Sequence, residues 1–168
     1  MRRMRYLVRE KVFSIGTDFW VTDEQDNKAF LVDGKVLHIR QTLEIKDPSG
    51  AVVATIRKKL VAVRETMEIE RDGAPAATVH KVLVSPLHHR YVIDHADGGQ
   101  LEAVGNIVDK EFQIQSGGQA VAQVSRSWFR IRDTYGVDVA PGQDDVLMIA
   151  IAVCIDRIHH DEEERRDH

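Results

Sequence analysis

DDVLMIAIAVCIDRIHH, from Asp144 to His160, is the stretch of sequence that decides the fold. Every residue from Val146 to Ile155 is apolar, and aspartates flank the run on both sides. A helix that is apolar along one stripe lies on a surface, whereas a helix that is apolar all round has to be enclosed. The sequence upstream is a series of short strands and turns, so we expect those strands to form the enclosure.

Three structures are compatible with this apolar run. A transmembrane helix needs about 20 apolar residues, and the run is roughly half that length. A buried strand is compatible with the valines and isoleucines, but Leu147, Met148 and Ala150 favour a helix. Asp144 is a good N-cap, and Asp145 would lie in the first turn, where the helix dipole favours a negative charge. We therefore predict a central core helix over about 144–160, with a core formed by Val146, Leu147, Ile149, Ile151, Val153 and Ile155.

Turn signals recur at short intervals before the helix. They are Asp26-Asn27, Asp33-Gly34, Asp47-Pro48-Ser49-Gly50, Asp72-Gly73, Asp97-Gly98-Gly99 and Ser116-Gly117-Gly118. Between them, apolar and polar residues alternate, most clearly over the predicted strand from Lys35 to Lys46. Alternation with period two is typical of a strand with one buried face. Regularly spaced short strands predict a sandwich or a barrel.

Closure into a barrel removes the exposed edges that an open sheet has to protect. We expect a mainly β protein, a closed antiparallel barrel of about twelve strands around the central helix. A single domain would span 1–160, followed by a charged tail over 161–168 that is frayed and solvated. On this interpretation, deleting the tail should leave the melting temperature nearly unchanged.

Composition excludes some classes of function. The 168 residues carry a net charge of −4, a balance that does not favour a nucleic-acid-binding protein. Cys154 is the single cysteine and lies inside the apolar run, so we expect it to be a small core residue. The N-terminal MRRMRYLVRE has no apolar segment of the secretory type, so the cytoplasm is the expected compartment.

The residues also carry a family resemblance. DGKVLHIRQTLEIKDPSGAVVATIRKKL (Asp33 to Leu60), followed by an apolar C-terminal helix ending IDRIHHD, resembles the LURP-one-related family. That family is similar in fold to the phospholipid scramblases and to the tubby C-terminal domain. The resemblance covers about 6–161 and implies a twelve-stranded barrel around a C-terminal helix. It implies no established enzyme activity and no catalytic residues, and its analogy with tubby domains and scramblases suggests a peripheral role at a membrane surface.

A basic segment is the candidate binding site. Arg57, Lys58 and Lys59, helped by Arg40 if its strand is adjacent, could bind an anionic lipid headgroup. The alternative is that these bases form a solvated strand edge. A second basic group, Arg126, Arg130 and Arg132 around Trp128, has the same two interpretations.

Candidate chemistry is sparse elsewhere. His159, His160 and Asp161 form the densest cluster of metal-ligand types, but histidines at a helix C-terminus also complement the dipole, and we expect no metal and no cofactor. No phosphate loop, nucleophile elbow or kinase pattern occurs. The sequence thus leaves open a non-catalytic module that binds anionic lipid headgroups, a protein-interaction module, and an enzyme of unrecognised type, in that order.

Overall fold

The computed structural model describes residues 3–9, 18–35, 42–59, 66–85, 88–128 and 134–168. These residues form twelve strands followed by one helix. The elements are β1 (Met4–Arg9), β2 (Phe19–Asp23), β3 (Lys28–Lys35), β4 (Thr42–Lys46), β5 (Val52–Lys59), β6 (Thr66–Arg71), β7 (Ala74–Ser85), β8 (His88–His95), β9 (Gln100–Asn106), β10 (Glu111–Ser116), β11 (Gln119–Ser125), β12 (Thr134–Val139) and α1 (Asp145–Arg166).

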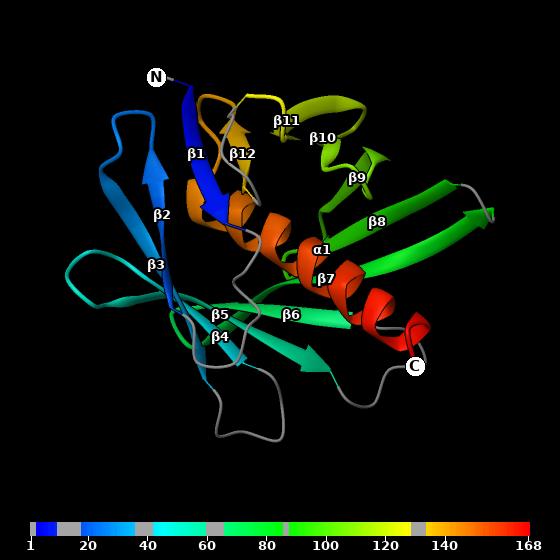
Figure 1. Cartoon of the computed structure of the whole chain (residues 1–168), viewed down its shortest axis with the longest axis horizontal. Helices are drawn as coiled ribbons and strands as arrows, with labels where there is room; N and C mark the ends of the chain where they lie inside the picture. Colours follow the sequence, from blue (N-terminus) through cyan, green and yellow to red (C-terminus); the bar gives the residue numbers. More distant parts are fainter. Residues whose placement is uncertain (1–2, 10–17, 36–41, 60–65, 86–87, 129–133) are drawn as a thin grey trace.

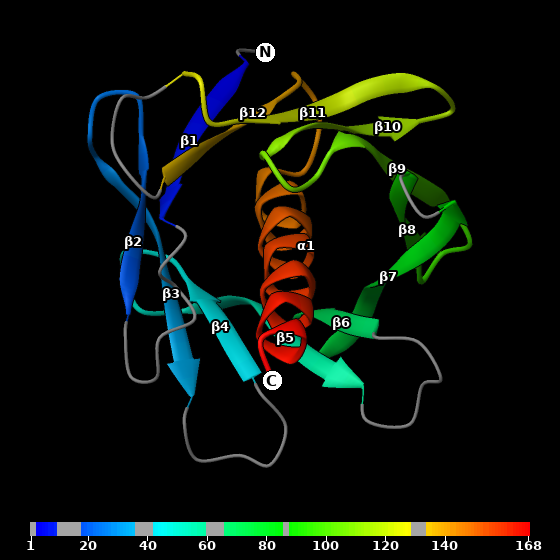
Figure 2. The same cartoon turned by 45° about the vertical axis from the view of Figure 1, so that its right-hand side comes forward.

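The strands form one closed antiparallel barrel, as the sequence predicts. Each strand pairs with its neighbours in the chain, and β1 closes the ring by pairing with β12. The helix α1 runs through the ring of strands, which Figure 2 shows most directly. The ends of the described chain lie on different sides of the molecule in Figure 1, β1 near the start of α1 and the C-terminus at its far end.

A ring of fully buried residues explains how the strands enclose the helix. Every strand contributes at least one residue with no solvent exposure, and all but Ala103 in the following set are β-branched. They are Val8, Val21, Val32, Ile45, Ile56, Ile69, Val79, Ile93, Ala103, Ile114, Val124 and Val137. β-branched side chains pack well on a pleated surface. The alternation in the sequence therefore places one layer of these side chains against α1.

The helix begins as the sequence predicts. Asp144 is the N-cap, and its Oδ1 accepts a hydrogen bond of 3.2 Å from the backbone N–H of Leu147. Asp145 in the first turn accepts a hydrogen bond from the hydroxyl of Tyr6 on β1. All residues from Leu147 to Ile155 are buried, so the apolar run is enclosed on all sides. No helix among the described residues is long and apolar enough to cross a membrane.

Two predictions about the strands were wrong. Asp33 and Gly34 are not a turn but lie within β3, where they pair with Glu44 and Leu43 of β4. The predicted strand from Lys35 to Lys46 is also divided, since Lys35 ends β3 and pairs with Thr42 at the start of β4. Residues 36–41, where the predicted strand alternates, lie outside the described residues, and the pairing of Lys35 with Thr42 shows that the chain reverses between β3 and β4.

The predicted frayed tail was wrong as well. α1 continues to Arg166, so the first six residues of the proposed tail are helical. Asp161 in this part of the helix is buried. The sequence after Ile158 is strongly charged, and Asp161 and Glu162 in it form ion pairs with Lys58 and Lys81 of the barrel wall.

Candidate functional site

The basic segment predicted from the sequence lies on β5, and its three side chains do not share one surface. Successive side chains of a strand point to opposite faces of the sheet. Ala54 and Ile56 are buried against the lumen, and Lys58 follows them on the same face. Arg57 and Lys59 therefore point outward, where they are 45% and 47% exposed.

Each outward base faces an acid on the neighbouring strand β6. Arg57 Nε lies 3.6 Å from Glu70, and Lys59 Nζ lies 3.4 Å from Glu68. The outer face of β5 is therefore charged but locally balanced. Arg40, the fourth predicted site residue, lies outside the described residues.

The predicted core helix residues lie where the sequence placed them. Leu147, Ile149, Ile151, Val153 and Ile155 are buried in the lumen, and Val146 is partly buried against the same core. Cys154 is also fully buried, and burial raises the pKa of its thiol well above its ordinary value. This part of the helix is structural.

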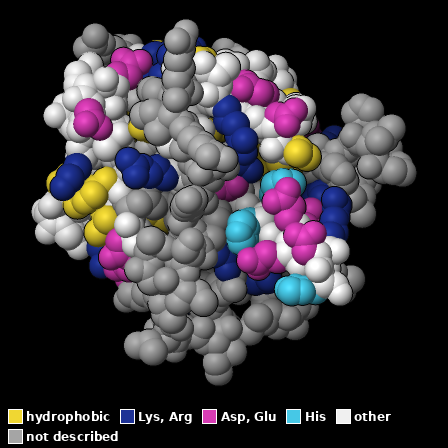
Figure 3. All heavy atoms as spheres, in the orientation of Figure 1, with side chains coloured by type: hydrophobic (Ala, Val, Ile, Leu, Met, Phe, Trp, Pro, Cys, Tyr) yellow, Lys and Arg dark blue, Asp and Glu magenta, His cyan; other side chains and the backbone are white. Residues whose placement is uncertain are grey.

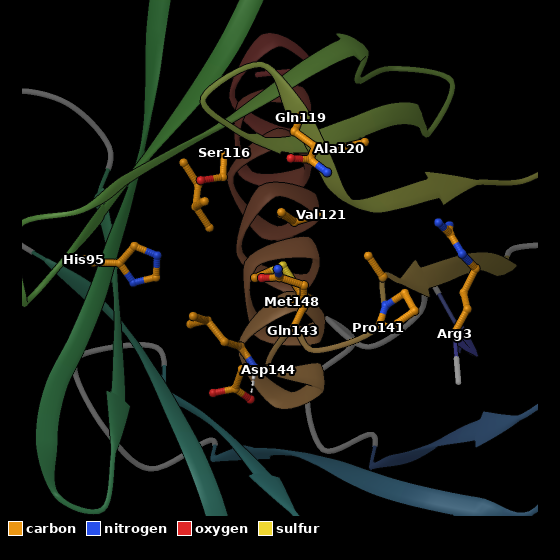
Figure 4. A pocket seen from close by; sticks show the side chains of 13 residues that line it. Arg3, His95, Ser116, Gln119, Ala120, Val121, Pro141, Gln143, Asp144 and Met148 are labelled. Atoms are coloured by element: carbon orange, nitrogen blue, oxygen red, sulfur yellow. Dashed lines mark hydrogen bonds between the residues drawn. The ribbon is translucent and has the colours of Figure 1, made fainter. Parts of the chain in front are cut away.

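A pocket of about 590 Å³ lies at the N-terminal end of α1, at one mouth of the barrel. We call it the mouth pocket. Its polar lining comes from Arg3, His95, Ser116, Gln119, Gln143 and Asp144. Its apolar lining comes from Leu101, Ala120, Val121, Ala140, Pro141, Leu147 and Met148. In Figure 4, His95 lies on one side and Arg3 on the other, with Gln143 and Met148 between them.

The two fully charged side chains of the mouth pocket already have partners. Arg3 Nη1 lies 3.2 Å from Oδ1 of Asp138, a buried carboxylate that also accepts a hydrogen bond from Arg5. Asp144 caps the helix and accepts a hydrogen bond of 2.6 Å from Arg71. Both therefore serve to hold the mouth of the barrel in shape.

The other polar side chains of the pocket differ from Arg3 and Asp144 in this respect. Within the described part of the chain, the side chains of His95, Ser116, Gln119 and Gln143 have no hydrogen-bond partner. They surround a floor that includes the buried Leu147 and Met148. Ser116, Gln119 and Gln143 are exposed and His95 is half-buried, so these side chains can bind water or a polar ligand.

Sequence reasoning missed the mouth pocket because its residues are far apart in the chain. His95 ends β8, Ser116 and Gln119 flank the β10–β11 turn, and Gln143 precedes α1. In an antiparallel barrel, alternate connections lie at the same end. Assigning every second turn signal to the same end of the barrel would therefore have placed these residues together at one mouth. It would not have predicted the pocket.

The other end of α1 is bound to the barrel by charge. Three lysines from separate barrel segments each meet a carboxylate of the helix. Lys58 of β5 lies 3.3 Å from Asp161, Lys81 of β7 lies 2.6 Å from Glu162, and Lys110 of the β9–β10 turn lies 2.7 Å from Asp156. Figure 3 shows acidic, basic and histidine side chains gathered at this C-terminal end of α1.

Lys110 and Asp156 form the deepest of these pairs. Their side chains are 3% and 8% exposed, and Lys110 lies in the left-handed region with φ of 56°. Burial raises the pKa of Asp156 despite the nearby ammonium of Lys110. Its Oδ2 has no hydrogen-bond partner among the described residues. Breaking one half of such a pair leaves a buried charge, which is strongly destabilising.

Two of the three metal-ligand types predicted from the sequence, His160 and Asp161, come close together at this end, with Glu164 in place of His159. Ligand atoms of His160, Asp161 and Glu164 lie within 4.8 Å of one another. However, Asp161 is bound on one oxygen by Lys58 and on the other by Arg157, which lies 3.2 Å away. Two cations thus already supply the positive charge that a metal ion would bring to this carboxylate.

The second basic group from the sequence is only partly described. Arg126 is exposed, whereas Arg130 and Arg132 lie outside the described residues. Trp128 is half-buried under the guanidinium of Arg5, whose Cζ lies 4.2 Å from the ring centroid. A cation over an indole face is a favourable contact. Trp128 therefore has a packing role at the N-terminal strand.

Comparison with known proteins agrees with this architecture. The family profile described as LURP-one-related matches residues 4–156. The uncharacterized protein YxjI of Bacillus subtilis is 27% identical over 157 residues, which is 94% of each chain. A solved structure of a protein from Arabidopsis thaliana has the same fold, with a TM-score of 0.71, 17% identity, and coverage of 94% of this chain and 91% of that one. The profile match over most of the chain shows that the protein belongs to the LURP-one-related family.

Proposed function

We propose that the protein is a non-catalytic binding module that takes a small, uncharged polar ligand in the mouth pocket. The observation that carries this proposal is the pocket itself, where four polar side chains without a hydrogen-bond partner among the described residues surround an apolar floor. The helix fills the lumen, so a ligand has this space at the mouth instead. A volume of about 590 Å³ lies within the usual range for small-molecule sites.

The chemistry of the lining favours a hydroxylated ligand. The amides of Gln119 and Gln143 and the hydroxyl of Ser116 can each donate and accept a hydrogen bond. A sugar hydroxyl does the same, and the ring face of a sugar can lie on Leu147 and Met148. An ionic ligand has less support, because Arg3 and Asp144 are already engaged by Asp138 and Arg71.

The same pairing supports a role without catalysis. General acid or base catalysis needs a titratable group placed against the reacting atoms. Asp144, the carboxylate in the pocket's described lining, is held by the helix cap and by Arg71, and the His95 imidazole forms no ion pair with a carboxylate among the described residues. The role of Asp144 in the fold accounts for its position.

The test is a binding measurement with a panel of neutral monosaccharides and disaccharides, detected by saturation-transfer NMR. We expect Gln119→Ala/Gln143→Ala to weaken binding by about tenfold, since two hydrogen bonds are lost. Gln25→Ala is the matched control, because Gln25 is exposed in the β2–β3 turn away from the pocket. Equal saturation transfer in the double variant and the wild type would place any sugar elsewhere, and no transfer at all would reject the ligand class.

A second candidate is binding to an anionic membrane surface, which the family's fold analogy suggests. Its structural support is the pair Arg57 and Lys59, which lie on one outward face of β5. Bases close to an anionic surface contribute about 1 kcal/mol each. The acids Glu68 and Glu70 beside them reduce this attraction, so the binding would be weak and sensitive to salt.

Vesicle flotation tests this second candidate. Lys59→Glu should abolish binding to vesicles that contain phosphatidylserine, and Lys28→Glu, with the same change in charge on β3, should have little effect. Equal losses in both variants would indicate a response to net charge alone. Failure of the wild type to bind at low salt would reject the membrane surface and favour a protein partner.

A further inference from the structure

The C-terminal third of α1 is held differently from the rest of the helix. Up to Ile158 the helix is held by apolar burial, but none of residues 159–168 is apolar. Beyond that point, ion pairs link the helix to the barrel, Lys58 with Asp161 and Lys81 with Glu162. The last two turns of α1 therefore depend on charge for their docking.

The helix and the barrel contribute opposite charges to these pairs. The barrel supplies the bases and the helix supplies the acids in both pairs. Lys58 is on β5 and Lys81 on β7, two strands apart and hence roughly 10 Å apart along the wall. Met67 of β6, which pairs with Lys58, also pairs with Val79 of β7, two residues before Lys81. Both lysines thus lie toward the same end of the barrel, and we call them the lysine pair.

The helix would not favour these acids by itself. Carboxylates near the C-terminus of a helix meet the negative end of the helix dipole and are disfavoured there. Asp161 and Glu162 are followed by two more acids, Glu163 and Glu164, before the final arginines. The pair Arg157–Asp161 within the helix, 3.2 Å apart, offsets part of this cost. A segment with few apolar contacts is still one that opens locally while the rest of the protein stays folded.

We infer that the lysine pair is an anion-binding site that is occupied by the helix's own carboxylates, and that a phosphate-class anion competes with the helix end for it. Lys58 and Lys81 are 29% and 12% exposed, so the site is partly covered rather than sealed. The Lys110–Asp156 pair lies deeper and keeps the preceding turns in place when the end is released. The consequence is a helix end whose docking responds to anions.

This site is separate from both candidates above. The mouth pocket lies at the other end of α1, and Arg57 and Lys59 point away from the lumen. Failure of the sugar or Lys59→Glu experiments would therefore leave this inference intact. Failure of the experiments below would likewise leave the mouth pocket and the membrane surface as candidates.

The first experiment uses the full wild-type chain and inorganic pyrophosphate at constant ionic strength. Hydrogen exchange of the backbone amides of residues 159–166 should quicken on the order of tenfold with pyrophosphate, because binding and release are coupled. Amides of Leu147 to Ile155 should not change. Equal exchange with pyrophosphate and with chloride at the same ionic strength would overturn the inference, since that result would reflect screening alone.

The second experiment compares two variants with the same change in net charge. Asp161→Asn/Glu162→Gln removes the two helix carboxylates that face the lysine pair, and we expect pyrophosphate to bind on the order of tenfold more tightly than to the wild type. Glu163→Gln/Glu164→Gln is the control, because neither acid is paired with these lysines. Equal gains in both variants, or none in either, would overturn the inference.

A binding experiment with vesicles distinguishes a lipid headgroup from a soluble anion as the source of the phosphate. If Asp161→Asn/Glu162→Gln also binds phosphatidic acid vesicles better than the control does, the site takes a lipid headgroup. If it prefers pyrophosphate but not vesicles, the site takes a soluble anion. In both cases Lys58→Met/Lys81→Met should remove the pyrophosphate binding, and binding that survives this change would overturn the assignment.

Discussion

Ile151 shows at the scale of one residue why α1 has to be enclosed. It has no solvent exposure and lies near the middle of the apolar run. Burying a side chain of this kind contributes roughly 1.5–3 kcal/mol. A carboxylate at the same place would have no partner and would cost far more.

Ile151→Asp should therefore prevent folding, whereas Ile151→Val should cost only about 0.5–1.5 kcal/mol. The measurement is solubility and cooperative thermal unfolding of both variants. A soluble Ile151→Asp protein with a sharp transition would contradict the central position of the helix.

Gly105 is a second position at which a small change in one side chain should alter stability, here the addition of a Cβ atom. Its φ is 133°, and an added Cβ would lie 2.8 Å from the carbonyl oxygen of Glu111 and 2.8 Å from Cα of Phe112. Gly98 also has a positive φ, 97°, but nothing lies within 4 Å of its Cβ position. Gly105→Ala should thus be less stable than Gly98→Ala by about 1–3 kcal/mol in urea unfolding. Equal losses of stability in the two variants would show that β10 shifts to accommodate the added Cβ.

At the scale of elements, the end of α1 is the feature with the clearest consequences. The sequence predicted that residues 161–168 could be deleted without effect, but α1 continues to Arg166 and Asp161 is buried. A chain that ends at His160 should lose about 1–3 kcal/mol of stability, because two charged hydrogen bonds to Lys58 and Lys81 disappear. A chain that ends at Arg166 is the control and should melt as the full chain does. Identical melting of the two truncated chains would show that the ion pairs contribute nothing.

His159 gives this end of the helix a dependence on pH. Burial lowers its pKa below the ordinary value of 6.5, with Lys110 acting in the same direction and Glu163 against it. As the pH falls below about 6.5, the unfolded chain takes up the proton first, so stability is full above that pH and declines through the window below it. Urea unfolding at a series of pH values should show a shallower decline for His159→Gln than for the exposed control His168→Gln. Parallel curves would assign the decline to other groups.

The elements also show what the sequence could and could not predict. Asp47-Pro48-Ser49-Gly50 becomes the β4–β5 turn because its hydrogen bonds are local, with Oδ1 of Asp47 accepting from Ser49 and Ala51. Asp33-Gly34 has a similar local signal but lies inside β3, because pairing with β4 decides its conformation. The partners of Lys58 and Lys81 are about 80 to 100 residues away in the chain, at Asp161 and Glu162. No local pattern predicts such pairs.

At the scale of the whole molecule, the barrel and the helix depend on each other. The ring of buried side chains from all twelve strands belongs to one hydrophobic core together with the apolar run of α1. A chain that ends at Asp144 keeps every strand but has no core to close on. We expect it to lack a cooperative melting transition and near-ultraviolet dichroism, and to bind a hydrophobic dye. A sharp transition in that chain would show that the barrel closes without the helix.

The order of the elements along the chain has a further consequence for biosynthesis. The ribosome makes all twelve strands before it makes α1, the element around which they assemble. Until α1 leaves the exit tunnel, the inner faces of the strands have no permanent partner and remain open to chaperones or to other nascent chains. A stop codon before Val146 would therefore release a complete set of strands that cannot bury its apolar face. Such a chain is prone to aggregate.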